Sequence, residues 1–150
     1  MSTGAHIDAL VALLVARDWT TATPAQIVAG AVPNALDYPV IAVYAGAGRA
    51  VDETLDGVEW QETVEIVIAS TQGVDGAADN QGMLIGLKDE IVALLYTTPD
   101  FGEPTDVRDS HVTGWDRAVV TFEDESENLL TFDYLTIHVD VRYALDLSGN

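Results

Sequence analysis

The sequence predicts an α+β fold, a two-layer sandwich in which two helices cover one face of a mixed or antiparallel sheet of four to five strands. Two observations support this fold class. Apolar residues recur at helical spacing in one segment near the N-terminus and in another near the middle of the chain. Apolar and polar residues alternate instead along other segments, above all in the C-terminal third. With a length of 150 residues, we expect residues 1–150 to form a single domain in the element order αββαβββ.

The N-terminal part of the chain should form a helix followed by an irregular segment. Residues 3–18 are expected to form the helix, with Thr3 as its N-cap. Residues 19–37 contain prolines and a glycine between polar residues, so they are expected to form an extended loop. A single helical turn over residues 24–28, with the proline at its first position, fits within that loop.

Two apolar strands are expected to follow. Residues 38–44 are apolar almost throughout, which indicates a strand that is covered on both faces. Residues 45–60 are glycine-rich and polar, and they are expected to form a second extended loop. The strand over residues 60–70 turns three apolar side chains to one face: Val64, Ile66 and Ile68.

The second helix is expected in the middle of the chain. Either Asp79 or Asn80 can act as its N-cap, and the helical spacing continues to about Tyr96. Gly86 inside a helix costs about 1 kcal/mol relative to Ala, which indicates close packing against another segment at this position. The inner face of this helix should consist of Leu84, Leu87, Ile91, Leu94 and Leu95.

The last third of the chain is expected to be β structure. Two short strands, over residues 107–113 and 117–123, lead through a turn over residues 124–128 into a long strand over residues 129–145. One face of the long strand carries Leu135, Ile137, Val139, Val141, Tyr143 and Leu145. The other face, which we expect to meet water or a partner, carries Tyr134, Thr136, His138, Asp140 and Arg142.

The composition excludes several classes of function. The chain has no cysteine, which excludes disulfides, a thiolate nucleophile, iron–sulfur clusters and cysteine-type zinc sites. Asp and Glu number 25 against 6 Lys and Arg, and a net charge of −19 argues against binding nucleic acid through its phosphates. With one lysine, and 16 Asp against 9 Glu, the composition is typical of proteins from salt-adapted organisms. The alternative is a moderately acidic protein from a mesophile with a GC-rich genome, in which lysine is also scarce. At 1 M salt the Debye length is about 3 Å, so the self-repulsion of such a chain largely disappears.

The sequence contains no complete motif of a catalytic or cofactor site. The acidic run over residues 123–127 lacks the glycine and the ligand spacing of a calcium loop, so a solvated turn is expected. Residues 46–48, Gly-Ala-Gly, lack the third glycine and the following helix of a dinucleotide loop. His138 and Asp140 share a strand face, but nothing in the sequence joins them to the Asp-Ser-His segment at residues 109–111. We therefore expect no catalytic residue, no metal, no cofactor and no enzymatic activity.

Other segments bear on localisation and on contacts. No run of 18 or more apolar residues is present, and no basic segment precedes an apolar stretch at the N-terminus, so neither a membrane span nor a standard signal peptide is expected. Trp19, Trp60 and Trp115 stand at the edges of predicted elements. Tryptophans in such places either cover the margin of a core or anchor an interface, and both interpretations stay open.

The layout of residues 5–145 resembles the small tail terminator, or tail completion, proteins of long-tailed bacterial and archaeal viruses. Three features in order carry the resemblance: Tyr38-Pro39 opening an apolar strand after the first helix, the pattern Val64-x-Ile66-x-Ile68, and a last strand ending in Val139-x-Val141-x-Tyr143.

The resemblance implies a structural virion protein made in the host cytoplasm. Such proteins form a homo-oligomeric ring, usually a hexamer, that caps the tail tube and joins it to the neck. The implied partners are other copies of the chain, the tail tube protein and the head–tail connector proteins, while DNA passes through the lumen without specific binding. No membrane is involved, and the composition suggests a halophilic host.

The two extended loops, residues 19–37 and 45–60, are expected to contact neighbouring subunits or the tube, because loops of this length in a compact domain are usually functional. Arg49 is expected to pair across a subunit boundary, since it lies among Asp52, Glu53 and Asp56. The full set of interface candidates is Trp19, Arg49, Asp52, Glu53, Trp60, His138, Asp140 and Arg142.

Two alternatives remain. The nearest is another head–tail connector, stopper or neck protein of the same class of virus. The alternative of a different class is a small halophilic enzyme or ligand-binding domain, which predicts a closed apolar pocket and a monomer or dimer instead of a ring.

Overall fold

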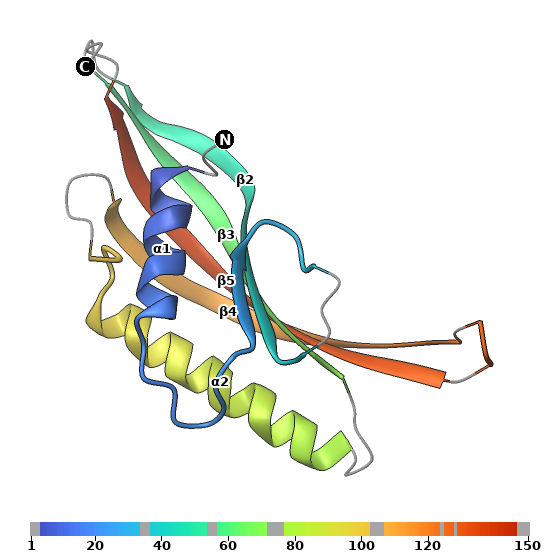
Figure 1. Ribbon diagram of the computed structural model, residues 1–150. Helices are drawn as coiled ribbons and strands as arrows, with labels where there is room; N and C mark the ends of the chain where they lie inside the picture. The colour runs from blue at the N-terminus through green and yellow to red at the C-terminus, as the bar shows by residue number, and fades with distance from the viewer. Residues whose placement is uncertain are drawn as a thin grey trace.

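The computed structural model describes residues 4–33, 37–53, 57–71, 77–102, 107–123, 125–127 and 129–146. In chain order the elements are α1 (Ala5–Val15), β1 (Gln26–Ala29), β2 (Val40–Glu53), β3 (Gly57–Thr71), α2 (Ala77–Thr97), β4 (Val107–Glu123) and β5 (Leu129–Asp146). Both helices lie on the same face of one five-stranded sheet (Figure 1). This arrangement confirms the predicted α+β class with its two layers.

The strands lie in the order β1-β2-β3-β5-β4. β1 runs parallel to β2, and all other neighbouring strands are antiparallel, so the sheet is mixed. The element order is αβββαββ, and the predicted order αββαβββ is wrong because one strand was missed and one strand was divided in two.

The missed strand is β1, which lies within the predicted loop over residues 19–37. Residues 26–29 pair in parallel with Val40–Val43 and do not continue a helical turn over residues 24–28. Four residues at a sheet edge are too few to show an alternating pattern. Their two β-branched side chains favour an extended backbone beside the buried β2.

The divided strand is β4. The predicted strands over residues 107–113 and 117–123 form one continuous element. Residues 114–116, which the prediction left outside both strands, belong to β4. A register shift between Val112 and Gly114 takes up the irregularity without ending the strand, as β-bulges do.

The predicted loop over residues 45–60 is a hairpin in the structure. β2 continues to Glu53, and β3 begins at Gly57. Two register shifts, within residues 45–48 and 50–52, accommodate the glycine-rich sequence. The outer part of β2 is exposed on both faces, so no core imposes an alternating pattern on it.

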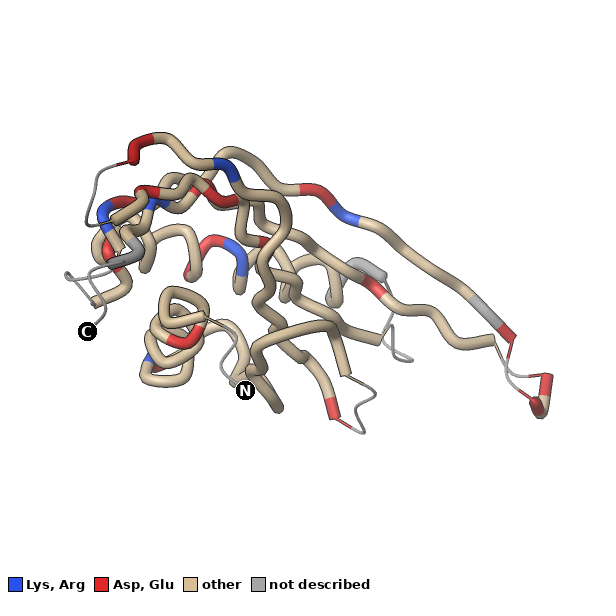
Figure 2. Tube along the Cα trace, turned by 90° about the horizontal axis from the view of Figure 1, so that it is seen from above, with Lys and Arg blue, Asp and Glu red and all other residues tan. Residues whose placement is uncertain are grey.

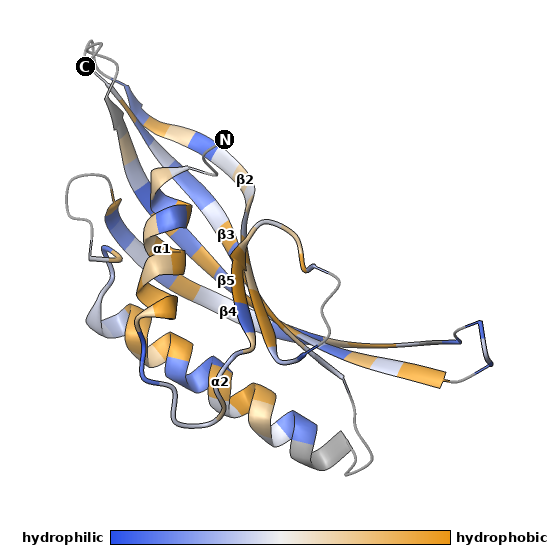
Figure 3. Ribbon diagram, viewed as in Figure 1, coloured by the Kyte–Doolittle hydropathy of each residue, from blue (hydrophilic) through white to orange (hydrophobic). Residues whose placement is uncertain are grey.

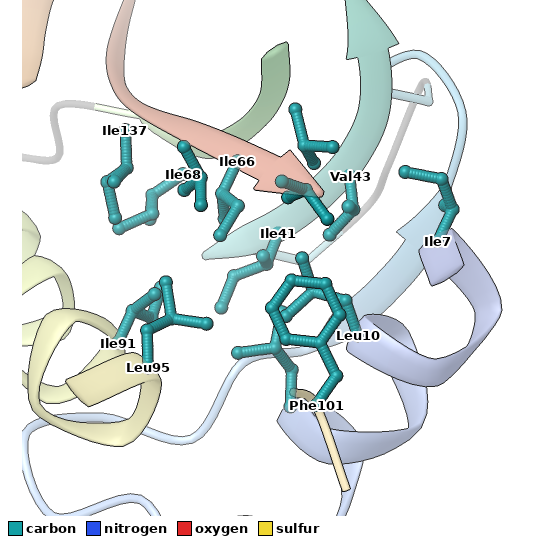
Figure 4. Packing of buried hydrophobic residues seen from close by; sticks show 14 of the residues in the cluster. Ile7, Leu10, Ile41, Val43, Ile66, Ile68, Ile91, Leu95, Phe101 and Ile137 are labelled. Carbon is teal, nitrogen blue, oxygen red and sulfur yellow. The ribbon is translucent and has the colours of Figure 1, made fainter. Parts of the chain in front are cut away.

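The hydrophobic core lies between the two helices and the sheet (Figure 4). The predicted inner faces of the second helix and of the long strands are confirmed, except that Leu94 and Tyr143 are only partly buried and that the side chain of Leu145 lies outside the described ones. The largest fully buried side chains are Ile7, Leu10, Leu14, Ile41, Ile66, Ile68, Leu84, Leu87, Ile91, Leu135 and Ile137.

Glu90 of α2 fastens the segment that follows α1. Its carboxylate accepts hydrogen bonds from the backbone N–H groups of Thr20 and Thr21, each at 2.9 Å, and from Arg17 at 3.1 Å. Burial raises the pKa of Glu90, but the hydrogen bonds from Thr20 and Thr21 outweigh burial and lower the pKa to about 2. A Cβ atom at Gly86 would lie 2.7 Å from the Thr21 side chain, which confirms the predicted close packing.

A buried polar network joins β3, α2, β4 and β5. The Asn80 side chain donates to Asp133 at 2.5 Å and accepts from the Ser70 hydroxyl at 2.7 Å. Arg117 Nε donates to the other carboxylate oxygen of Asp133 at 2.8 Å. The predicted N-cap at residues 79–80 is wrong, because α2 begins before them and the Asn80 side chain belongs to this network.

The first helix is shorter than the predicted residues 3–18. It begins at Ala5 with Gly4 at the N-cap position and ends at Val15. Thr3, the predicted N-cap, lies outside the described residues.

Candidate interaction surface

The face of the sheet that points away from α1 and α2, which we call the outer face, collects side chains from four strands. Successive strand residues point to opposite faces. Since Ile66 and Ile137 face the helices, their neighbours Glu65 and His138 point outward. The register places the outward residues of β2, β3, β5 and β4 in one continuous surface.

One half of the outer face is an apolar hollow. Its volume is about 530 Å³, and it is lined by Ala31, Val32, Tyr44, Val67, Ala118, Tyr134 and Thr136. Phe132 extends the apolar lining along β5, with its ring 6.4 Å from that of Tyr134 and 6.0 Å from that of Tyr38. The hollow is thus built from aromatic and aliphatic side chains, which is typical of a contact surface.

A histidine held between two carboxylates borders the hollow. His138 Nδ1 bonds to Glu65 on β3, and His138 Nε2 lies 2.6 Å from Asp116 Oδ2 on β4. The hydrogen bond to Asp116 raises the pKa of His138, burial opposes this, and the nearby Glu65 carboxylate adds to the increase. The arrangement connects three strands by charge-assisted hydrogen bonds.

The other half of the outer face is polar. Arg49 donates to the Gln61 side chain at 3.2 Å, and Asp140 accepts from Gln61 and Thr63 at 3.4 Å each. Arg142 lies opposite Gln61 in the strand register. Four interface candidates from the sequence, Arg49, His138, Asp140 and Arg142, therefore share this face.

The remaining candidates lie elsewhere. Asp52 and Glu53 lie near the outer end of β2, opposite residues of β3, and Asp56 lies outside the described residues. Trp19 packs against the core on the helix side, with the Arg17 guanidinium 5.9 Å from its ring centroid.

The edge positions predicted for two tryptophans are wrong, because the strands extend further than the sequence indicated. Trp60 lies inside β3 opposite Tyr143, and Trp115 lies inside β4. Trp115 is 46% exposed, and the Lys88 ammonium lies 5.0 Å from its ring centroid.

Sequence reasoning missed the most exposed apolar part of the chain. Beyond the last pairing of β3, Thr71 with Phe132, β4 and β5 continue as a two-stranded hairpin. We call residues 119–123 and 129–131 the arm; Val119 and Val120, which lie opposite Asp133 and Phe132 beside the end of β3, form its base. The arm projects away from both helices (Figure 1). Figure 3 shows apolar residues at the start of β5, within the arm. Its exposed apolar side chains are Val119 (51%), Val120 (43%), Leu129 (73%) and Leu130 (40%).

A signal for the arm was present in the sequence. Val119-Val120 and Leu129-Leu130 are adjacent apolar pairs, and adjacent strand residues point to opposite faces. Such pairs at the end of an alternating strand indicate a hairpin that is apolar on both faces. The acidic residues between the two pairs indicate only a solvated turn, so they do not show that apolar pairs flank it on both sides.

A second missed cluster ties α1 to the sheet. His6 Nε2 lies 2.6 Å from Glu62 Oε1, and the His6 ring stacks on Tyr143 with centroids 4.0 Å apart. The Tyr143 hydroxyl donates to Glu62 Oε2 at 3.1 Å. Burial and the Glu62 charge raise the pKa of Tyr143 to about 12. His6 is buried and Glu62 and Tyr143 are partly buried, and their mutual contacts join α1 to β3 and β5.

The Asp-Ser-His segment at residues 109–111 does not form a hydrolytic site. Ser110 and His111 are adjacent in β4 and so point to opposite faces. Leu95, Tyr96, Ser110 and His111 are among the residues that line a hollow of about 220 Å³ at the end of α2, and the buried Ser110 hydroxyl has no hydrogen-bond partner among the described residues. Within the described residues, no group of three or more His, Asp and Glu side chains is arranged to hold a metal ion.

Comparison with known proteins assigns no function to this surface. The chain matched no protein-family model and no curated protein. Of the helices in the described part of the chain, neither is long and apolar enough to cross a membrane.

Proposed function

We propose that this chain is a structural virion subunit similar to tail terminator proteins, which assembles with copies of itself into a ring at the end of a tail tube. In this role the ring ends tube growth, joins the tube to the neck and lets DNA pass through its centre. The observation that carries the proposal is the arm, a projecting hairpin with four exposed apolar side chains.

Exposed apolar hairpins of this kind are unusual on a free subunit. A row of apolar residues on a protruding strand pair is an aggregation hazard unless another chain covers it. The rest of the surface opposes association, because a net charge of −19 makes copies of the chain repel one another in dilute salt. An apolar arm on an otherwise repelling surface supports association at one defined place.

The charge distribution is compatible with a DNA conduit. Acidic residues lie along the strands and at the tip of the arm, and basic residues are few (Figure 2). A wall of carboxylates repels phosphates and so keeps DNA from adhering. In molar salt this repulsion reaches only about 3 Å, so the charge adds little weight to the proposal.

Electron microscopy of tails assembled without the protein tests the proposal. We expect tubes of uncontrolled length, or tubes of normal length that do not join heads. Supplying the chain from a plasmid should restore normal particles. Tubes of normal length that join heads in its absence would refute the proposed role.

A further inference from the structure

We infer that the arm of one copy of this chain packs into the apolar hollow on the outer face of a second copy. This inference rests on the proposed function, because it assigns the contact that would repeat around the ring. The occupant of the hollow is therefore a segment of the same chain, carrying Val119, Val120, Leu129 and Leu130.

No described residue of the same chain covers the four apolar side chains of the arm. Leu129 pairs only with Glu123 of β4, beyond the reach of β3, and its side chain is 73% exposed. A two-stranded hairpin alone is marginally stable in water, and a packed apolar face is needed to hold it. Since both faces of the arm carry apolar side chains, contact with another surface removes this area from water.

The hollow offers the complementary surface. Tyr44, Val67, Ala118 and Tyr134 line it, and it opens on the outer face, where neither helix lies. The arm of the same copy cannot fill it, because the arm leaves the sheet in the plane of β4 and β5 and points away from the body (Figure 1). An occupant of the hollow must therefore come from another molecule.

Charge complementarity favours a second copy over an unrelated apolar partner. The tip of the arm is acidic, with Glu123, Glu125 and Glu127 exposed. Arg49 and Arg142 are exposed on the polar half of the outer face. The ion pairs that Lys and Arg side chains make within the described residues engage Arg17, Lys88 and Arg117, and include neither of these two arginines.

The geometry of this contact leads to a ring. The arm and the hollow are different surfaces of one chain, so each copy uses both, one toward each neighbour. Such a head-to-tail contact closes into a ring when its rotation is suitable, whereas a contact between identical surfaces gives a two-fold dimer.

Disulfide trapping tests the contact directly, because the chain has no cysteine of its own. The variant Ala118→Cys places a thiol in the hollow, and Leu130→Cys places one in the arm. Ala118 pairs with Tyr134, four residues from Leu130, so the two positions lie about 13 Å apart in one copy. A disulfide needs Cα atoms roughly 4–7 Å apart, so any bond must join two copies.

The expected results are specific. When the two single variants are mixed and oxidised in molar salt, the main product should be a covalent dimer of one copy of each. Oxidation of the double variant should give a series of covalent oligomers, the largest of which contains as many copies as the ring. If Leu130→Cys links to itself as readily as to Ala118→Cys, the arms meet each other and the inference is wrong. Absence of any link, while the wild-type chain assembles, also overturns it.

A charge placed in the arm provides an independent measurement. Leu129→Asp, at an arm position that is 73% exposed and away from the Asp133 network, should weaken association by at least about tenfold, as sedimentation or mass photometry in molar salt would show. The matched control is Val15→Asp at the end of α1, whose side chain is 61% exposed and far from the arm. It should associate like the wild type. Equal effects of both substitutions, or a wild type that stays monomeric at high concentration, would contradict the arm contact.

Failure of this inference differs from failure of the proposed function. If rings form without the trapped disulfide, the tail role stands and another surface makes the contact. If the disulfide forms but tails are normal without the protein, the chain associates as inferred and serves in another structure.

Discussion

The body of the sheet and the arm are built from the same two strands, but they differ in what covers them. In the body, Leu135 and Ile137 of β5 are completely buried under the helices. In the arm, Leu129 and Leu130 of the same strand are 73% and 40% exposed. The comparison teaches that apolar content alone does not define a core. A strand is buried only where a second layer covers it, and the described part of the chain places no such layer over the arm.

The first prediction, which has the largest expected effect, tests this difference. Leu87→Ala removes a fully buried side chain of α2 and should lower the free energy of unfolding by about 2–5 kcal/mol. Leu129→Ala in the arm should change it by less than about 0.5 kcal/mol in the monomer. Denaturant unfolding at fixed salt and low protein concentration measures both. An equal loss at the two positions would mean that the arm is packed within its own chain.

The second prediction concerns the fastening of the helix layer. The folded-state pKa of Glu90 is about 2, below its ordinary value of 4.5. Its ionised form therefore contributes about 3 kcal/mol of stability above pH 4.5, and this contribution is lost as the pH falls toward 2.

The variant Glu90→Gln removes the ionisable carboxylate and so measures its contribution to the free energy of unfolding. It should be less stable than the wild type at pH 7, and the difference should narrow between pH 4.5 and pH 2 in unfolding experiments. A difference that stays constant over this range would show that the carboxylate charge is not what holds Thr20 and Thr21.

The third prediction tests packing in the same region. Gly86→Ala should destabilise the body by about 1–3 kcal/mol, although Ala favours helix, because its Cβ would meet the Thr21 side chain at 2.7 Å. Gly82→Ala, in the same helix, is the control, since nothing lies within 4 Å of a Cβ there. That change should stabilise by up to about 1 kcal/mol. Thermal unfolding compares the two, and stabilisation by both would contradict the observed contact.

The fourth and smallest effect is expected at His138 on the outer face. Because the folded-state pKa of His138 is raised above 6.5, its charged form stabilises the fold fully below pH 6.5. This contribution is lost as the pH rises through the folded-state pKa. The imidazole is 32% exposed, so the effect should be on the order of 1 kcal/mol or less.

Titration of the His138 ring by NMR checks the direction of the shift. His138→Gln should remove the corresponding pH dependence of stability, whereas His111→Gln, at an exposed position of β4, should leave it in place. A ring that titrates below 6.5 would contradict the two-carboxylate arrangement.

The sequence predicted the structure correctly where burial of one face makes apolar residues recur at a fixed spacing. The alternation of Val64, Ile66 and Ile68 and the helical spacing of Leu84, Leu87 and Ile91 identified faces that are buried in the structure. The same reasoning failed at the outer part of β2 and in the arm, because exposed strands carry no such pattern.

The candidate surface could be predicted only in part. Because successive strand residues point to opposite faces, the sequence alone places His138, Asp140 and Arg142 on one face of a strand. The strand register then adds Glu65 and Asp116, which no local pattern indicates, since pairing depends on the whole sheet. The short β1 escaped prediction because its four residues acquire their conformation from the neighbouring β2.

The buried network around Asp133 lies where the arm leaves the body, because Asp133 pairs with Val119, the first residue of the arm. Asn80 and Arg117 hold its carboxylate from α2 and β4, so tilting the arm breaks hydrogen bonds inside a closed environment. If arms link neighbouring copies, this joint fixes the turn from one copy to the next, and with it the circumference of the assembly. Asp133→Asn should loosen this joint, so disulfide-trapped assemblies of the variant should differ in the number of copies when measured by native mass spectrometry. A single size, equal to that of the wild type, would show that the network does not set the turn between neighbouring copies.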